Sequence, residues 1–501
     1  MSIHWIKKEA VATAHELRKV MEQAPQGVVG IATAELIRSI NEKDALRWKQ
    51  EADIVHAGLS FNAGNSFQNV QLCTFNWHFI NPLTDRQAVS WKATRDFILW
   101  DKELLEKIGT IDEAYQCPDA ALMDWVYRAL VAGAKTIHRP WPVVKKKEIE
   151  IPLVSREDEM LFVCKHFNRR AQIFYRFCQL FLHGKWLPLR QIEVDQQVQF
   201  ESIKLTQALM RRKVESYAAL IPTIDRYAYI TKSIDSLLTL KFPPQEIVVV
   251  DQTPEDKRRP EVYEAYIKQG CVKVIYLDQA GQSTARNRGL AEVKQHWVLL
   301  FEDDSEAWPD MVDEHIDLVE RSGCDVSTGV IVPPGADRNF IPERNRRYFL
   351  SDIFTTGNAF MRIETVWEVG GLDSAFDHGP GADDDFGKRL YRAGKIIVYN
   401  YKSIETHHKA PQGGMRVHGV WWRNTSTLLG PYPPVTQSFA IMKYYPHKYR
   451  FFLFLNMILK ARKKYSVGSY ILFFFLLPYK LSISINRAGK LIKKHENTYS
   501  G

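Results

Sequence analysis

The stretch Trp297-Val-Leu-Leu-Phe301-Glu302-Asp303-Asp304 decides the fold class. Its apolar run is typical of a parallel strand that is covered on both faces. The run ends in three adjacent carboxylates, which repel one another unless a cation lies between them. Mg²⁺ or Mn²⁺ on phosphate oxygens would supply that charge. An acidic loop in water is the alternative interpretation.

The chain around this stretch alternates between strand and helix patterns. Apolar runs at 217–221, 246–250 and 272–276 are expected strands, and 230–240 has the spacing of an amphipathic helix. This succession predicts a doubly wound, mostly parallel α/β sheet with helices on both faces. Right-handed crossovers bring the carboxyl ends of such strands to one edge, where ligands bind. The residues expected at that edge are Pro222, Thr223, Asp251 and 302–304.

Length and composition set the class of protein. A chain of 501 residues predicts two or three domains, and an apolar content of 45% is ordinary for a globular protein. The first twenty residues carry charges throughout, so no secretory signal is expected there. Six cysteines occur without a CxxC pair, which favours reduced thiols in the cytoplasm and argues against a zinc site.

Positive charge is concentrated near the C-terminus. Between Thr406 and His495 there are fifteen Lys or Arg residues and no Asp or Glu, and the remainder of the chain is net negative. The apolar runs 451–459 and 467–477 in this segment are too short to span a bilayer. Because Lys and Arg flank them, we expect helices that lie on an anionic membrane surface. A helical pair packed on the catalytic domain or on a dimer partner is the alternative, and nucleic-acid binding is disfavoured.

Residues 107–133 align without a gap with residues 368–394, at an offset of 261. An internal duplication is the interpretation, against chance similarity between two amphipathic helices. Leu122 stands where the second copy has Asp383, so the first copy is expected to be non-catalytic. The identical pairs are Gly109/Gly370, Asp112/Asp373, Ala114/Ala375, Asp124/Asp385, Arg128/Arg389 and Gly133/Gly394.

These patterns predict four segments. Residues 1–140 form the degenerate repeat, with 1–50 expected to be helical, and 141–215 form a helical connector. Residues 216–420 form the catalytic domain, and 421–501 form the basic and apolar helical tail.

The loop from Asp278 to Gly289 is a candidate diphosphate site. A glycine-containing turn, Ser283 as the expected N-cap and a short basic helix would suit a diphosphate, and Arg286 offers a planar fork to phosphate. The GxGxxG fingerprint and the phosphate-binding loop of nucleotide hydrolases are both missing from the sequence. Hydride transfer and ATP hydrolysis on those folds therefore lose support.

Seven motifs in order give the chain a resemblance to family-2 glycosyltransferases with a GT-A fold, over about residues 217–416. The motifs are Leu220-Ile-Pro-Thr223, Val248-Val-Val-Asp251, Gly281-Gln-Ser-Thr-Ala-Arg-Asn-Arg-Gly289, Phe301-Glu-Asp-Asp304, Gly357-Asn-Ala-Phe-Met361, Gly370-Gly-Leu-Asp373 and Gly381-Ala-Asp-Asp-Asp-Phe-Gly-Lys-Arg389. The resemblance implies a nucleotide-sugar donor, a divalent cation and an inverting transfer.

The resemblance also implies roles on the donor side. Asp251 corresponds to the acid that contacts the ribose or base, although a turn or N-cap Asp is an equally ordinary reading of this residue alone. Residues 302–304 correspond to the Asp-x-Asp motif that holds the cation on the donor diphosphate. The motif usually begins with Asp, whereas this sequence has Glu302 there, so Asp304 is the better supported metal ligand. Residues implied at the donor site also include Pro222, Thr223, Arg286 and Asp303.

On the acceptor side, Asp383 corresponds to the catalytic base. Such a base removes the acceptor proton from the face opposite the leaving group, and burial beside like charges would raise its pKa usefully. Asp384 and Asp385 leave this assignment open by one or two positions, and an acidic helix N-terminus is the alternative. His407 corresponds to an additional metal ligand, with His408 as its competitor. Gly413 and Gly414 are expected in a mobile loop over the donor or acceptor.

The function expected from all this is polysaccharide or glycolipid synthesis at the inner face of a membrane. A sugar-phosphate nucleotidyltransferase is one alternative, but the position after the first strand reads Pro-Thr-Ile-Asp-Arg226 rather than a glycine-rich loop. A non-catalytic scaffold is the other alternative. Intact acids in the second copy count against it.

Overall fold

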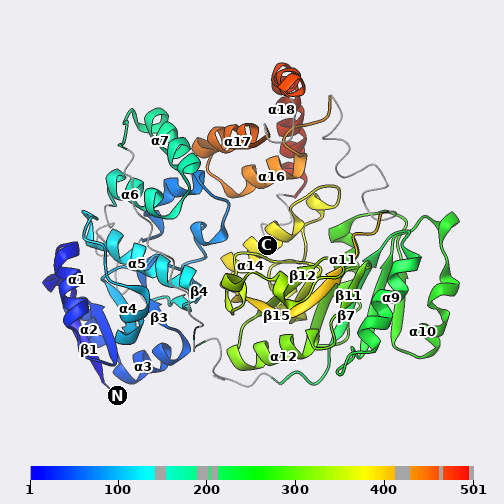
Figure 1. The fold of residues 1–501 in the computed structure, drawn as a ribbon, viewed down its shortest axis with the longest axis horizontal. Coiled ribbons are helices and arrows are strands. Elements are labelled where there is room, and N and C mark those ends of the chain that lie inside the picture. Colours follow the sequence, from blue (N-terminus) through cyan, green and yellow to red (C-terminus); the bar gives the residue numbers. More distant parts are fainter. Residues whose placement is uncertain are drawn as a thin grey trace.

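The computed structural model describes residues 2–61, 63–141, 154–188, 202, 204, 213–411, 429–461 and 467–495 (Figure 1). Gly413 and Gly414 lie outside the described residues. Two sheets with their helices lie side by side in Figure 1, and the C-terminal helices lie above them.

The larger sheet belongs to the C-terminal half and has nine strands in the described part of the chain. Its order is β11-β15-β12-β14-β10-β7-β8-β9, and β13 pairs with β15. β14 runs antiparallel to both β10 and β12, whereas β7, β8, β9 and β10 are mutually parallel. The prediction of a doubly wound, mostly parallel sheet is confirmed. Its strands are β7 (Ala218–Thr223), β8 (Glu246–Asp251), β9 (Val272–Tyr276), β10 (Trp297–Phe301), β11 (Ser305–Ala307), β12 (Val326–Val332), β13 (Phe349–Leu350), β14 (Asn358–Arg362) and β15 (Ile397–His407).

Helices pack on this sheet through buried apolar side chains, such as Ile230 and Ile234 on one helix and Leu318 on another. All five residues of β10 are buried, as expected for a strand covered on both faces. The helices are α9 (Tyr227–Leu238), α10 (Glu264–Lys268), α11 (Gln282–Leu290), α12 (Met311–Ser322), α13 (Ile363–Glu368) and α14 (Ala382–Arg392).

The smaller sheet lies in the N-terminal half, with six described strands in the order β1-β2-β5-β3-β6-β4. The helical prediction for residues 1–50 is wrong at both β1 and β2. β2 is a fully buried five-residue run, and so short a run does not distinguish a strand from a buried helix. The strands are β1 (Ile3–Lys7), β2 (Val28–Ala32), β3 (Ile54–His56), β4 (Ala88–Val89), β5 (Phe97–Asp101) and β6 (Thr136–His138). The helices are α1 (Ala14–Gln23), α2 (Ala34–Ser39), α3 (Glu42–Glu51), α4 (Lys102–Ile108) and α5 (Pro118–Ala132).

The two sheets share one topology. The order β1-β2-β5-β3-β6-β4 corresponds to β7-β10-β14-β12-β15-β13, with the same parallel and antiparallel pairings at every step. The register agrees as well, since Ile54 pairs with Trp100 as Val326 pairs with Met361. The strands β4, β5 and β6 begin 261 residues before β13, β14 and β15.

A buried ionic network on α14 ties together the C-terminal half. Asp385 accepts hydrogen bonds from Arg389 Nε at 2.8 Å, Lys443 Nζ at 2.7 Å and Tyr444 Oη at 2.5 Å. Lys443 also donates to Asp373 at 3.0 Å. Lys443 and Tyr444 belong to α16 (Val435–Tyr444), so this network fixes the first tail helix on α14.

The N-terminal half repeats this network. Asp124 on α5 is held by Arg128 Nε at 3.1 Å, Lys165 Nζ at 2.7 Å and His166 Nε2 at 2.7 Å. Lys165 also donates to Asp112 at 2.9 Å, as Lys443 does to Asp373. Lys165 and His166 lie on α6 (Arg156–His166), inside the segment expected to be a connector. Helix α6 therefore packs on the N-terminal domain as α16 packs on α14.

We predict that Asp124→Ala and Asp385→Ala each lower the free energy of unfolding by about 3–5 kcal/mol. Both carboxylates are fully buried, and their removal takes the central anion from a network of two or three cationic partners. Urea unfolding measures the loss. The matched control is Asp317→Ala, whose half-exposed ion pair with Arg321 is worth less than about 1 kcal/mol. Losses below that of the control would contradict the prediction.

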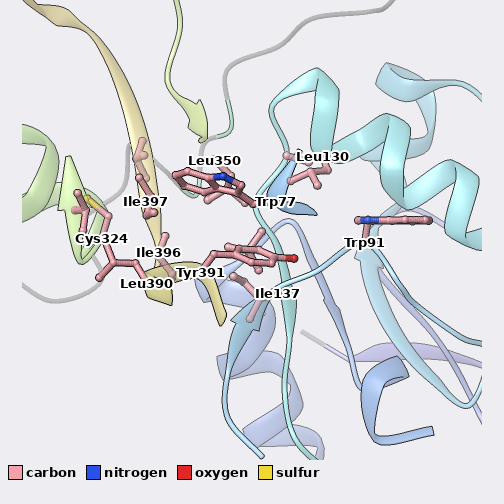
Figure 2. Close-up of a cluster of buried hydrophobic side chains, with 14 of the residues drawn as sticks. Trp77, Trp91, Leu130, Ile137, Cys324, Leu350, Leu390, Tyr391, Ile396 and Ile397 are labelled. Carbon is pink, nitrogen blue, oxygen red and sulfur yellow. The ribbon is translucent and has the colours of Figure 1, made fainter. Parts of the chain in front are cut away.

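The two halves share one hydrophobic core. Figure 2 shows Trp77 and Ile137 of the N-terminal half close to Leu350 and Tyr391 of the C-terminal half. Gly387 on α14 makes this approach possible, because a Cβ there would lie 1.7 Å from the Trp77 ring. The halves are therefore fixed against each other by apolar packing.

The remaining described helices form the connector and the tail. They are α7 (Arg169–His183), α17 (His447–Ala461) and α18 (Val467–His495). Among the helices that the structure describes, none is both long enough and apolar enough to cross a bilayer.

Candidate active site

A cleft of about 430 Å³ opens at the carboxyl edge of β7 and β10, where the sequence places its candidate residues. Its walls come from strand ends of the larger sheet and from the N-terminus of α14. The lining includes Pro222, Thr223, Arg226, Gln252, Gln282, Arg286, Glu302, Asp303, Asp304, Thr356, Asp383, Asp384 and His407.

The three acids after β10 form one cluster. Glu302, Asp303 and Asp304 each offer a carboxylate oxygen within 4.8 Å of the others. Asp303 is anchored by Thr223 Oγ1 at 2.8 Å and by Arg226 Nη1 at 2.7 Å. Burial raises the pKa of Asp303 to about 6, against the effect of Arg226.

Asp304 is the acid best placed to hold a cation. Its Oδ2 accepts the Ala410 amide at 2.8 Å and lies 3.5 Å from His407 Nε2. Its Oδ1 is buried and has no hydrogen-bond partner among the described residues. Such an orphaned oxygen beside two further carboxylates and an imidazole fits a divalent cation with oxygen and nitrogen ligands. His408 instead lies 2.9 Å from Glu306, so the structure brings His407 to the cluster rather than its neighbour.

Asp383 faces the same cleft from the opposite wall. Its Oδ1 accepts a hydrogen bond from Thr356 Oγ1 at 2.9 Å, and the carboxylate is half-buried at the start of α14. Burial raises the pKa of Asp383, while the Arg286 charge opposes that shift. A carboxylate with one hydrogen bond, a raised pKa and an open face has the properties of a general base.

Asp384 and Asp385, which follow Asp383, form hydrogen bonds and ion pairs with other protein side chains. Asp384 accepts a hydrogen bond from Trp77 Nε1 at 2.8 Å and pairs with Lys388. Asp385 is enclosed by the network described above. Of these three consecutive acids, Asp383 thus has the carboxylate that is free to act on a ligand in the cleft.

Arg286 links helix α11 to the acidic cluster. Its Nη2 donates to Glu302 Oε1 at 2.6 Å, and its Nη1 donates to the Gln282 carbonyl at 3.1 Å. Its Nε is buried without a hydrogen-bond partner among the described residues. Arg286 therefore keeps a donor available beside the acidic cluster.

The N-terminus of α11 differs from expectation. Gly281, rather than Ser283, is the N-cap. The Asp377 carboxylate accepts the first free amides, from Ser283 at 2.7 Å and Thr284 at 2.9 Å. Because a protein carboxylate already accepts these amides, the expectation of Ser283 as the N-cap is wrong, and a diphosphate beside Arg286 stays a prediction.

Asp251 is placed at the end of β8 as predicted, but it lies beneath the cleft. Its Oδ2 accepts the hydroxyls of Tyr227 at 2.9 Å and Tyr263 at 3.1 Å, and its Oδ1 accepts the Thr253 amide. The side chain is fully buried, and Gln252 is the residue of this strand end that lines the cleft. A direct contact with a ribose requires the tyrosines to move, so that role stays a prediction.

Three residues of the site were not singled out from sequence. Arg226 pairs with both Asp303 and Asp304, and its position just after β7 was a usable signal. Thr356 orients Asp383 from a loop with no recognisable pattern. Trp77 contacts Asp384 across 307 residues of chain, which no local pattern can predict.

Comparison with known proteins gives a family match over part of the chain. Residues 218–376 match the model of glycosyl transferase family 2, and no curated protein sequence matches the chain. This part of the chain is therefore a family-2 glycosyltransferase domain. Asp383 and His407 lie beyond the matched residues.

Solved structures with similarity to the chain include residues 1–349 of S. aureus TarS, at 17% identity and a TM-score of 0.33. The alignment covers 38% of this chain and 60% of that one. GalNAc-T7 with UDP, GalNAc and Mn²⁺ aligns at 14% identity and a TM-score of 0.36, over 51% and 58% of the two chains. The mannosyltransferase PcManGT from Pyrobaculum calidifontis, with GDP-Man and Mn²⁺, aligns at 16% identity and a TM-score of 0.36. This alignment covers 58% of this chain and 90% of that one. This chain thus covers less than two thirds of the first two structures.

Proposed function

We propose that the protein is an inverting glycosyltransferase that moves a sugar from a nucleotide-diphosphate donor to a hydroxyl acceptor. The observation that carries this proposal is the cleft itself, in which the half-buried Asp383 faces the Glu302–Asp304 cluster. A base on one wall and a cation-binding cluster on the other match the needs of a single displacement.

We assign a separate role in the transfer to each of several cleft residues. Asp383, oriented by Thr356, accepts the proton of the acceptor hydroxyl as the new bond forms at the sugar carbon. The sugar–phosphate bond breaks on the opposite side, and the nucleoside diphosphate leaves. Arg286 and Arg226 place positive charge beside the acidic cluster, where negative charge develops on the departing group.

Mg²⁺ or Mn²⁺ would be held by Glu302, Asp304 and His407. When bound, such a cation offsets charge on the donor diphosphate. The unpaired Oδ1 of Asp304 is the feature that supports this assignment.

Release of nucleoside diphosphate tests this proposal. The protein is incubated with a panel of nucleotide sugars in Mn²⁺, in Mg²⁺ and in EDTA. We expect release from one donor, dependent on the cation. Failure of every donor, together with failure to bind any nucleotide with Mn²⁺, would contradict the proposal.

We further propose that residues 1–140 are a non-catalytic copy of the catalytic domain. The shared sheet topology and the repeated aspartate network support this duplication. Leu122 stands where the second copy has Asp383, and the three acids that follow β10 are reduced to one after β2, where the chain reads Thr33-Ala34-Glu35. The contact from Trp77 to Asp384 gives this copy a structural role beside the base.

We also propose that the tail holds the enzyme on an anionic membrane at the cytoplasmic face, where a lipid-linked or surface glycan acceptor would be reached. Exposed aromatic side chains lie on its helices, with Phe451 66% and Phe475 80% exposed. The segment 406–495 has fifteen basic residues and no acidic ones, and each basic residue near an anionic surface contributes about 1 kcal/mol.

Vesicle sedimentation measures this binding. We expect the protein to bind anionic vesicles at least about tenfold more tightly than neutral ones, with loss at high salt. Phe451→Ser with Phe475→Ser should weaken binding, whereas Ile267→Ser, an exposed apolar residue on α10, should not. Equal affinity for neutral and anionic vesicles would count against the proposal.

A further inference from the structure

Glu405 is a buried carboxylate behind the acidic cluster. It lies on β15, where it pairs with Ala307 of β11 and Ile331 of β12, and it is fully buried. Glu405 and His407 are two residues apart on one strand, so their side chains leave the same face of the sheet. His407 contacts the acidic cluster, since its Nε2 lies 3.5 Å from Asp304 Oδ2.

Contacts at Gly357 show that Glu405 reaches the cluster. A Cβ on Gly357 would lie 3.2 Å from Glu405 Oε1 and 3.0 Å from Glu302 Cγ, so both side chains pack against this glycine.

Both carboxylate oxygens of Glu405 lack a hydrogen-bond partner of standard geometry among the described residues, as does Asp304 Oδ1, and the Ser305 hydroxyl beside Glu405 is an uncharged donor. Three orphaned oxygens in one buried region are unusual, because an unpaired buried polar group is costly and a buried charge more so. The cationic side chains that pair with the cluster are Arg226, Arg286 and His407. The guanidinium groups already pair with Asp303 and Glu302, and neither reaches Glu405 in the hydrogen bonds described.

We propose that Glu405 is an outer carboxylate of the divalent-cation site, a positioning residue that acts through Glu302 and strengthens cation binding. The inference rests on the proposed function, since it assigns a cation to the Glu302–Asp304 cluster. Outer carboxylates of this kind typically change metal affinity by about 10–100-fold.

Mn²⁺ binding without any donor tests the inference. Electron paramagnetic resonance of free Mn²⁺ gives the affinity of the full chain, of Glu405→Gln and of Glu302→Gln. Glu159→Gln is the matched control, because Glu159 is also a buried glutamate but lies in the N-terminal half, where Asn69 and Tyr175 hold it. We expect about tenfold weaker binding in Glu405→Gln, and no change beyond twofold in the control.

Thermal unfolding with and without Mn²⁺ supplies a second readout that a purely structural role would not move. Glu405→Gln keeps the shape of the side chain, so the metal-free variant should remain folded and should gain less stability from Mn²⁺ than the parent chain. Wild-type affinity in Glu405→Gln, with binding lost in Glu302→Gln, would overturn this inference and leave the proposed function standing. If the parent chain itself binds no Mn²⁺, the cation assignment and this inference both fall.

Discussion

Asp383→Asn should lower kcat by about 10²–10⁴-fold, the range for loss of a positioned general base. The amide keeps the shape of the side chain and can still accept the Thr356 hydrogen bond, so the fold should survive. What the variant loses is the site for the acceptor proton. Initial rates at saturating donor and acceptor measure the effect, with circular dichroism as the check on folding.

Asp384→Asn is the matched control. Its side chain is tied to Trp77 and Lys388, and the amide oxygen can still accept from the indole. We expect less than about a tenfold change in kcat there, well below the loss of a base. An equal or larger loss in Asp384→Asn would show that the base had been assigned to the wrong carboxylate.

The pH dependence of the reaction rate also tests whether Asp383 is the general base. A base must be deprotonated to act, and burial raises the pKa of Asp383 above that of a free aspartate. The rate should therefore fall as pH decreases, and the fall should begin at a higher pH than the ordinary value of about 3.9 predicts. A rate that stays constant down to that value would contradict a raised pKa at the base.

Asp304→Asn should abolish cation-dependent activity and reduce kcat/KM by about 10³-fold. Charge stabilisation by a bound cation contributes several kcal/mol, and about 1.4 kcal/mol corresponds to each factor of ten. Asp304 brings together the Ala410 amide, His407 and an unpaired oxygen, so its loss removes the centre of the site. Activity titrated against Mn²⁺ measures the change.

Glu306→Gln provides the comparison for this variant. Glu306 is two residues along the chain, with a side chain 41% exposed and directed to His408. Its neutralisation should leave the Mn²⁺ dependence unchanged. An Asp304→Asn enzyme that kept both its rate and its Mn²⁺ dependence would exclude Asp304 as the principal ligand.

The strands β7, β8, β9 and β10 of the C-terminal sheet, and the placement of the acids at their ends, could be predicted because local patterns encode them. Buried apolar runs that end in polar residues specify parallel strands with a functional edge, and the structure brings Thr223, Glu302, Asp304 and His407 to that edge. The 261-residue offset likewise pointed to the match between the halves.

Contacts made across the fold could not be predicted in this way. Asp377 caps α11 from 94 residues away, which displaced the expected role of Ser283. Trp77 reaches Asp384 only because Gly387 lets the halves pack closely. The β1 and β2 strands were missed because short apolar runs do not separate strand from helix.

The anomeric configuration of the first-formed product tests the central claim most directly. Proton nuclear magnetic resonance of the product, compared with the donor sugar, reports whether the reaction inverts the sugar carbon. A displacement by an acceptor hydroxyl activated by Asp383 predicts inversion. Retention of configuration would contradict the role assigned to Asp383 and require a different reaction in this cleft.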